Sequence, residues 1–295
     1  MRGLAEEQAA LRRVATLVAR GAAPEEVFAA VTEEVARLLS AEYAGLGRYE
    51  SDRTMTIVAG SGRRGDEIPV GRRWGLGGKN INTLVFETGR PARVDSYADA
   101  SGPLGVTARE YRAGSGVGAP VIVEGRLWGV MAAYSSPEEP LPSDTEARLA
   151  SFTELVATAI ANAESRAELA RLAEEQAALR RVATLVAHGT PPEEVFAAVV
   201  EEVARLLSAE YAAMGRYESD GTMTTVATSS QLGDHVPVGR RWTLGGKNVN
   251  TLVFETGRAA RLDNYADASG PLGVAARERG FGSGVGTPVI VEGRL

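Results

Sequence analysis

A glycine-rich segment that ends in a lysine and an asparagine is the first place where the sequence could do chemistry. Residues 70–80 read VGRRWGLGGKN, and glycines ahead of a helix can expose backbone amides to an anion. The phosphate loop of nucleotide-binding proteins would need a glycine at Arg73 and a hydroxyl at Asn80. We therefore do not predict ATP or GTP binding, but Lys79 and Asn80 remain candidates for holding a polar or anionic ligand. The same pair recurs as Lys247 and Asn248.

Aromatic side chains and an arginine in each half of the chain are candidates for lining a pocket. An aromatic ring can stack on a ligand, while a guanidinium can pair with a carboxylate or a phosphate. The candidates are Trp74, Tyr97, Arg109, Trp242, Tyr265 and Arg277. The alternative is that the aromatic residues belong to the core and that the arginines are solvated.

Cysteine and histidine are too scarce for most metal or nucleophilic chemistry. The chain has no cysteine, which excludes disulfides, thiolate metal sites, cysteine nucleophiles and a bilin attached through a thioether. Its two histidines are His188 and His235, at spacing that suits no shared metal site. Haem is not expected, because a lone loop histidine such as His235 is usually solvated. No nucleophile and base pair emerges, so we predict that the chain is not an enzyme.

Charge and hydropathy narrow the partners further. The net charge is -6, and no basic cluster is dense enough to track phosphates, so nucleic acid is not an expected partner. No apolar stretch approaches the ~20 residues that a bilayer crossing needs, and the N-terminus MRGLAEEQ lacks an apolar signal region. We expect a cytoplasmic protein without a membrane partner, and the sequence identifies no cofactor.

The candidate residues come in pairs because the chain contains one long segment twice. Residues 4–127 recur as residues 172–295 with 24 differences, which indicates duplication of a whole domain. Several differences crowd into GSGRRGDE against TSSQLGDH from residue 60, and YRA against RGF at 111–113. These loops either rim a pocket and tune it separately in each copy or have drifted; from the sequence alone we favour drift.

Apolar periodicity and turn signals predict an α+β domain in each copy. In the first copy the predicted elements are helices at 4–20 and 24–39, a strand hairpin at 43–61, short helices near 82–87 and 101–109 around a brief strand at 92–97, and a second hairpin at 114–135 that turns at Glu124-Gly125. The predicted domains cover residues 1–165 and 172–295.

A long helix is predicted at 143–188, overlapping both domains. It opens with a capping box formed by Ser143 and Glu146. Apolar residues at 149, 152, 156, 159 and 163, and again at 169, 172, 179 and 186, follow coiled-coil spacing, but the two stretches are out of step near Ser165. We interpret this as an interrupted coiled coil that joins the domains. The alternative is a helix packed wholly on its own domain.

Several sequence strings resemble the GAF domain. SGVGAPVIVEGRLWGVMAAYS resembles the closing hairpin of that family, while VGRRW, TGRPARVDSYAD and SFTELVATAIANAESRAEL resemble GAF modules of bacterial, especially actinobacterial, two-component sensor histidine kinases. The resemblance covers about residues 10–160 and, in part, 178–295. It implies a six-stranded antiparallel sheet flanked by helices, a small-molecule pocket between the sheet and the inserted helices, and dimers through the terminal helices.

Together these features predict a signal-input module that senses a small molecule and relays it through a helical dimer to an output such as a histidine kinase. The alternative is a degenerate pair of GAF domains that serves only for dimerisation or helix coupling. The second copy ends before the counterparts of the closing strand and the last helix, so we expect a truncated second domain with an unpaired strand edge. We also expect it to be poorly stable alone, and the chain to be a fragment of a longer protein.

Overall fold

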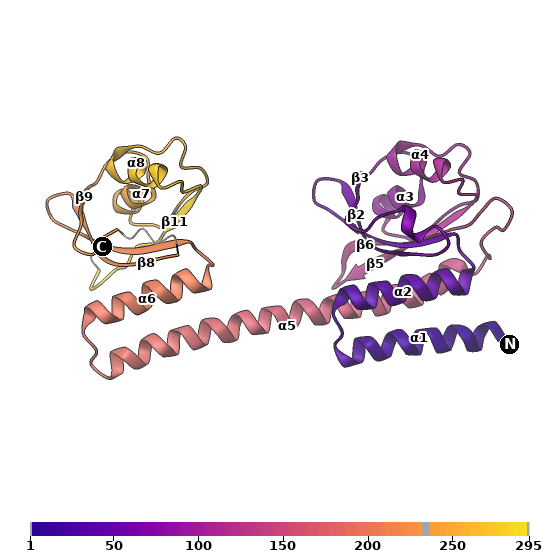
Figure 1. Cartoon of the computed structure of the whole chain (residues 1–295), viewed down its shortest axis with the longest axis horizontal. Helices are drawn as coiled ribbons and strands as arrows, with labels where there is room; N and C mark the ends of the chain where they lie inside the picture. The colour runs from indigo at the N-terminus through magenta and orange to yellow at the C-terminus, as the bar shows by residue number, and fades with distance from the viewer. Residues whose placement is uncertain (1, 232–235, 294) are drawn as a thin grey trace. The chain divides into compact units, whose positions relative to one another are not determined.

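The chain folds into two compact units, residues 1–169 and residues 170–295 (Figure 1). The structure, a computed structural model, describes residues 2–231, 236–293 and 295. His235 and the side chain of Leu4 lie outside the described residues. The predicted α+β class, with two GAF-type antiparallel-sheet domains and a long helix between them, is confirmed.

The first unit contains a complete sheet with two sets of helices. Its elements are α1 (Arg2–Arg20), α2 (Pro24–Leu39), β1 (Tyr43–Tyr49), β2 (Thr54–Ser61), the 3-10 turn η1 (Gly65–Glu67), β3 (Arg73–Gly75), α3 (Ile81–Thr88), β4 (Ala92–Val94), α4 (Gly102–Glu110), β5 (Gly116–Val123), β6 (Arg126–Tyr134) and the first part of α5 (Thr145–Ala187). The sheet order is β3-β2-β1-β6-β5-β4, and all neighbours are antiparallel. Both predicted hairpins are present. The second one turns at Glu124 and Gly125, whose φ values of 47° and 78° suit a two-residue hairpin turn.

The two faces of this sheet are covered by different helices (Figure 1). On one face, Ala44 and Leu46 of β1 join a core with α1, α2 and α5, in which Leu149 and Phe152 are almost fully buried. On the opposite face, Tyr43 and alternate residues of the central strands look toward α3 and α4. This alternation follows from the two-residue side-chain period of a strand, and it gives one face to the core and leaves the other for a site.

Helix α5 starts later than the capping box predicted. It begins at Thr145, and the carboxylate of Glu146 accepts hydrogen bonds of 2.6 and 2.7 Å from the guanidinium of Arg93. The predicted reciprocal bond of Glu146 toward Ser143 is therefore wrong, since β4 supplies a charged partner that local sequence does not reveal. Among the described residues, no helix combines the length and apolarity needed to cross a membrane.

The second unit repeats these elements up to the strand that corresponds to β5. They are the rest of α5, α6 (Pro192–Leu206), β7 (Tyr211–Tyr217), β8 (Thr222–Ser230), β9 (Arg241–Thr243), α7 (Val249–Thr256), β10 (Ala260–Leu262), α8 (Gly270–Glu278) and β11 (Gly284–Gly286). Its strands form two separate sheets, β7-β8-β9 and β10-β11. In the first unit β6 joins the two halves by pairing with both β1 and β5, and Leu295 corresponds to Leu127 at the start of that strand. The expected open edge along β7 is thus present in the described part of the second unit.

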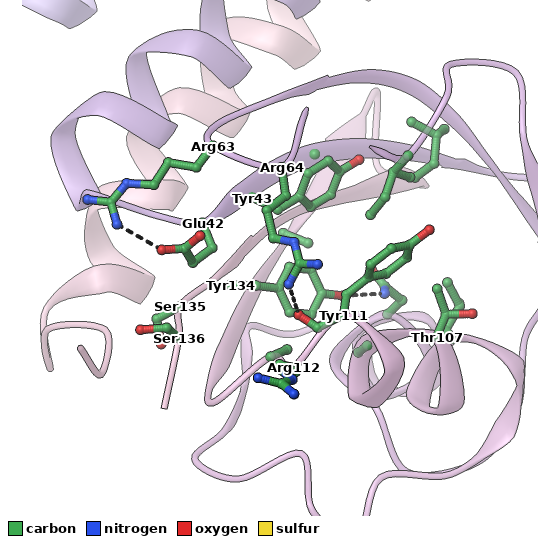
Figure 2. Close-up of a pocket in the computed structure, with 18 of the residues that line it drawn as sticks. Glu42, Tyr43, Arg63, Arg64, Thr107, Tyr111, Arg112, Tyr134, Ser135 and Ser136 are labelled. Carbon is green, nitrogen blue, oxygen red and sulfur yellow. Dashed lines mark hydrogen bonds and ion pairs between the residues drawn. The ribbon is translucent and has the colours of Figure 1, made fainter. Parts of the chain in front are cut away.

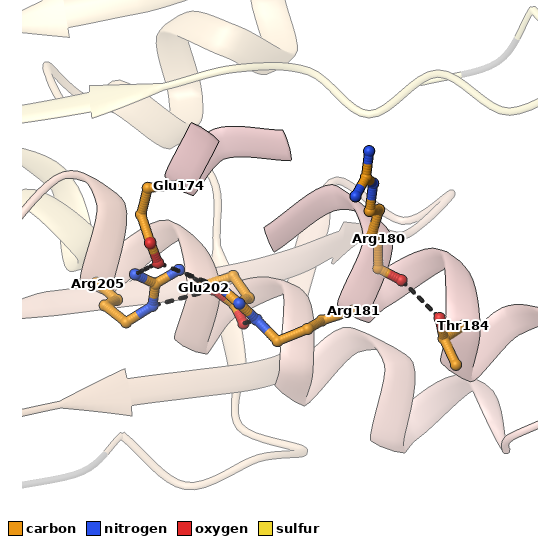
Figure 3. Close-up of polar contacts among 6 residues, drawn as sticks. All are labelled: Glu174, Arg180, Arg181, Thr184, Glu202 and Arg205. Carbon is orange, nitrogen blue, oxygen red and sulfur yellow. Dashed lines mark hydrogen bonds and ion pairs between the residues drawn. The ribbon is translucent and has the colours of Figure 1, made fainter. Parts of the chain in front are cut away.

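A charged network joins the end of α5 to α6 (Figure 3). Glu202 accepts from both Arg181, at 2.5 and 2.9 Å, and Arg205, and Arg205 also pairs with Glu174. The hydrogen bonds from Arg181 and Arg205 lower the pKa of Glu202 to about 2. Arg13, Glu34 and Arg37 form the equivalent contacts between α1 and α2. The duplicated helix therefore keeps the same ionic connection to its neighbour in each unit.

Candidate functional site

A cavity of about 500 Å³ lies on the α3 and α4 side of the first sheet (Figure 2). Its floor comes from β1, β2 and β6, its wall from Trp74, Asn82 and α4, and its rim from the segments around residues 63–68, 111–113 and 135–139. Much of the lining is apolar, including Met55, Ile57 and Leu104. A cavity of this size, with few polar groups, has the dimensions of a small-molecule site.

Two buried polar atoms on the cavity wall lack hydrogen-bond partners among the described residues. They are the hydroxyl of Tyr43 and the side-chain oxygen of Asn82, and these residues are 7% and 2% exposed. The amide nitrogen of Asn82 donates to the hydroxyl of Tyr134 at 2.8 Å, which fixes the orientation of the amide. Leaving a buried polar atom without a partner costs about 1–3 kcal/mol, so a bound molecule that supplies the partner is stabilised.

The interior of the cavity favours uncharged groups. Burial raises the pKa of Tyr134 to about 12, and burial together with the neighbouring Tyr134 raises the pKa of Tyr43. Both phenols therefore stay neutral at physiological pH and can donate a hydrogen bond. Desolvation acts in the same direction on any ligand group placed beside them, because a charged form would lose its hydration there.

The rim carries charges of both signs (Figure 2). Arg63 pairs with Glu42 at 2.9 Å, and Arg64 pairs with Glu67 at 3.0 Å while donating to the backbone oxygen of Tyr111. The hydrogen bond that Arg64 donates to Glu67 raises the pKa of Arg64. Arg112, Glu138 and Glu139 also line the rim, and within the described part of the chain their side chains make no ion pair.

The sequence-predicted candidates of the first copy do not gather at one place. Trp74 lies on the cavity wall, with the guanidinium of Arg72 4.7 Å from its ring centre. Tyr97 is 1% exposed, and its hydroxyl accepts from the amide of Ile81 at 3.3 Å, while Arg109 is exposed. Tyr97 and Arg109 border a second, open depression beside the cavity.

Lys79 and Asn80 lie outside the cavity, and Asn80 serves the fold. The side chain of Asn80 is fully buried; it accepts from the amide of Thr83 at 3.0 Å and donates to the carbonyls of Gly77 and Ser101. It is thus the N-cap of α3. Lys79 is exposed, and its amide donates to the hydroxyl of Ser101 at 2.9 Å.

The glycines beside this pair are required by close backbone packing. Gly102 has φ of 74°, and a Cβ there would lie 1.9 Å from the carbonyl oxygen of Gly77. A Cβ on Gly78 would lie 2.4 Å from the backbone of Gly102. Because segment 77–80 packs backbone to backbone against 101–102, its glycine content has a structural cause that needs no anion.

The second-copy candidates occupy the corresponding places. Trp242 is 7% exposed and donates to the hydroxyl of Thr225 at 3.2 Å, while Arg240 lies 4.0 Å above its ring. Asn248 caps α7 as Asn80 caps α3, and Lys247 is exposed. The two remaining candidates are Tyr265, which is in a small core cluster, and Arg277, which donates to the carbonyl of Ala268 at 3.3 Å.

The cavity also shows where the two copies differ. Of the 124 aligned positions, 17 line the cavity, and these hold nine of the 24 differences, although an even spread would place about three there. In the first copy the nine are Gly45, Ile57, Arg63, Arg64, Ile68, Thr107, Tyr111, Arg112 and Ala113. Drift over surface loops does not account for all nine, because Gly45 and Ile57 belong to β1 and β2. The differences instead follow the wall of one site.

No metal site is found among the described residues. Across the described ranges, no cluster of three or more His, Asp or Glu residues has the geometry to hold a metal ion.

Two family models match the two halves of the chain. Residues 23–160 match a family model for the GAF domain, and residues 189–295 match a second family model, also for a GAF domain. Among solved structures, the phycoerythrobilin-bound GAF domain of a cyanobacterial phytochrome is 17% identical, with a TM-score of 0.45 over 54% of this chain and 97% of that one. The GAF domain of an Acinetobacter phosphoenolpyruvate-protein phosphotransferase is 14% identical, with a TM-score of 0.43 over 55% and 97%. No curated protein matches the sequence.

Proposed function

Because the chain belongs to the GAF family in both of its copies, we propose that it is a signal-input module whose first unit binds a small molecule. GAF domains are sensory and ligand-binding modules. We place this one in the cytoplasm, upstream of an output such as a histidine kinase, and assign it no catalytic activity of its own.

One observation carries the proposal: a 500 Å³ cavity whose wall presents two buried polar atoms without partners. Native proteins satisfy most buried polar groups, and a bound molecule or an ordered water can supply the partners of these two atoms. Asn82 is held by Tyr134 and cannot turn its oxygen away without losing that bond.

Helix α5 offers a physical route for the relay. Its first turns pack Leu149 and Phe152 into the core beneath the sheet, and Glu146 binds Arg93 of β4. Arg93 also donates to the carbonyls of Leu141 and Pro142, just ahead of the helix. A ligand that shifts the sheet would therefore move the start of α5, and a continuous helix transmits such a shift along its axis.

Thermal denaturation in the presence of metabolites, nucleotides and haem tests the proposal. Binding to the folded form raises the free energy of unfolding by RT ln(1 + [L]/Kd), or about 2.7 kcal/mol at a ligand concentration of 100 Kd, and so raises the denaturation temperature. The Asn82→Ala variant is the matched control, because it removes the free acceptor and should reduce the response. A folded chain that answers to none of these compounds would contradict ligand sensing.

A second function, dimerisation without a ligand, is favoured by an apolar stripe on α5. Four residues at intervals of three and seven are between 43% and 65% exposed: Leu169, Leu172, Leu179 and Val186. Leu11 and Val18, which correspond to Leu179 and Val186, pack into a core with α5 in the first unit. The stripe therefore suits packing against another helix, here that of a second copy of the chain. We therefore propose a homodimer through this stripe.

Analytical ultracentrifugation of a Leu172→Glu, Leu179→Glu double variant tests the stripe. The parent should be a dimer and the double variant a monomer, with Glu175→Gln as a control outside the stripe. A parent chain that stays monomeric at all concentrations would refute this second function while leaving the ligand site untouched.

A further inference from the structure

The differences between the copies converge on one cavity residue, Tyr43. Its ring lies over Gly45 and Gly60, which face each other across β1 and β2. A Cβ on Gly45 would lie 2.5 Å from the hydroxyl of Tyr43, and a Cβ on Gly60 would lie 2.8 Å from it. The ring can therefore occupy this place only because both positions are glycine.

In the second copy both glycines are replaced. Ala213 stands at the position of Gly45, and Thr228 stands at the position of Gly60 with its hydroxyl donating to the carbonyl of Val236 at 3.4 Å. Tyr211, the counterpart of Tyr43, cannot lie over these side chains. Its flexible side chain must take another position.

That other position is against the ring of Phe281. The ring of Tyr211 stacks on Phe281, with centroids 5.2 Å apart and planes 30° apart. Phe281 replaces Ala113, which lines the cavity of the first unit. Tyr211 and Phe281 are thus in contact in the second unit, whereas Tyr43 and Ala113, at the equivalent positions, line the open cavity of the first unit.

The polar groups of the open cavity define what it accepts. The buried oxygen of Asn82 can only accept a hydrogen bond, so a ligand group that contacts it is an N–H or O–H donor. The apolar lining with Met55, Ile57 and Trp74 suits a flat ring system, and the burial that raises the pKa of Tyr43 and Tyr134 disfavours a negative charge at that end.

We propose that the first cavity binds an uncharged, largely apolar ring compound with a hydrogen-bond donor, and that Ala213, Thr228 and Phe281 close the second copy to it. This inference rests on the proposed function and makes the two copies unequal: the first is the receptor for this ligand class, and the second is not.

N-phenyl-1-naphthylamine is a suitable probe, because it is neutral, aromatic and carries one N–H. Binding is followed by quenching of tryptophan fluorescence in the full chain with Trp242→Phe, so that the signal comes from Trp74 and Trp128 of the first unit. The variants Gly45→Ala and Ala113→Phe introduce second-copy residues into the cavity. Ser96→Asn, which also introduces the second-copy residue but lies outside the cavity, is the matched control.

The parent and Ser96→Asn should bind one equivalent of the probe with equal affinity, and each cavity variant should bind at least tenfold more weakly. The N-methylated probe, which lacks the donor, should also bind at least tenfold more weakly to the parent. Urea denaturation of each variant establishes that it is folded, and two independent cavity variants guard against the failure of one.

Equal binding by Gly45→Ala, Ala113→Phe and the parent would overturn the closure. A parent that does not bind the probe would overturn the ligand class. In either case a metabolite response in the thermal screen would still support signal input, so failure of this inference is distinguishable from failure of the proposed function.

Discussion

Replacing Asn80 by alanine should destabilise the first unit by roughly 3 kcal/mol. Loss of the N-cap bond to the amide of Thr83 costs about 1 kcal/mol. The carbonyl of Ser101 loses the donor that Asn80 supplies at 3.2 Å, and an unsatisfied buried acceptor adds about 1–3 kcal/mol. The carbonyl of Gly77 keeps a bond from the hydroxyl of Thr83 at 3.3 Å, so its loss is smaller.

Urea denaturation followed by tryptophan fluorescence, again with Trp242→Phe, measures this change in the first unit. Asn80→Asp retains the capping oxygen but turns a second oxygen toward two carbonyls, so it should be at least as destabilising as alanine. Lys79→Ala, at the exposed neighbouring position, should change the free energy of unfolding by less than about 0.5 kcal/mol. If Asn80→Ala were within about 0.5 kcal/mol of the parent, the structural role would be wrong and the side chain would be available to a ligand.

Three further outcomes are expected. Gly102→Ala should cost more than about 2 kcal/mol in urea denaturation, because its Cβ would meet the carbonyl of residue 77, whereas Gly125→Ala, also at positive φ but in open space, should cost about 1 kcal/mol. A double-mutant cycle on Arg93 and Glu146 should give a coupling free energy of about 1 kcal/mol. Because Arg93 lowers the pKa of Glu146, this contribution to stability is present above the ordinary pKa of 4.5 and is lost as the pH falls through the lowered value. A coupling that survives full protonation of Glu146 would contradict the assignment. Burial raises the pKa of Tyr134 from 10 to about 12, so the unfolded chain ionises first and stability should fall as the pH rises from 10 to 12; the same slope in Tyr134→Phe would show that another group is responsible.

The elements of the fold were predictable because local sequence determines them. The strings YAGLGRY and TMTIVAGS, separated by ESDR, and the glutamate-glycine turn between β5 and β6 predict both hairpins at their observed places. The start of α5 was not predictable from local sequence, because Glu146 binds Arg93, which lies 53 residues away. A capping box is a local pattern, and Glu146 does not form it because the tertiary structure places a guanidinium beside its carboxylate.

The site was harder to predict because its two central atoms, the hydroxyl of Tyr43 and the side-chain oxygen of Asn82, are distinguished by their lack of a hydrogen-bond partner among the described residues. Tyr43 reads as an ordinary first residue of a strand, and Asn82 as a residue in the first turn of a helix. Their missing partners become visible only when β6 and α3 are in place. The glycine-rich segment that ends in Lys79 and Asn80 suggests an anion site, yet its glycines serve backbone packing. The sequence nevertheless contains a signal for the site: the second copy has larger side chains at the positions of Gly45 and Ala113, a change that we interpret from the sequence alone as drift.

The glycine pair beneath Tyr43 makes loss of ligand binding an easy evolutionary step. The hydroxyl of Tyr43 has no partner among the described residues, so displacing the ring breaks no hydrogen bond of that hydroxyl. Alanine at Gly45 also restricts the unfolded chain, which favours folding by about 0.4–1 kcal/mol where the backbone permits it. Substitution of Gly45 by alanine therefore moves the ring of Tyr43 out of its place without breaking a hydrogen bond of its hydroxyl to any described residue. After duplication, one copy can lose ligand binding through such a substitution while the other copy continues to sense.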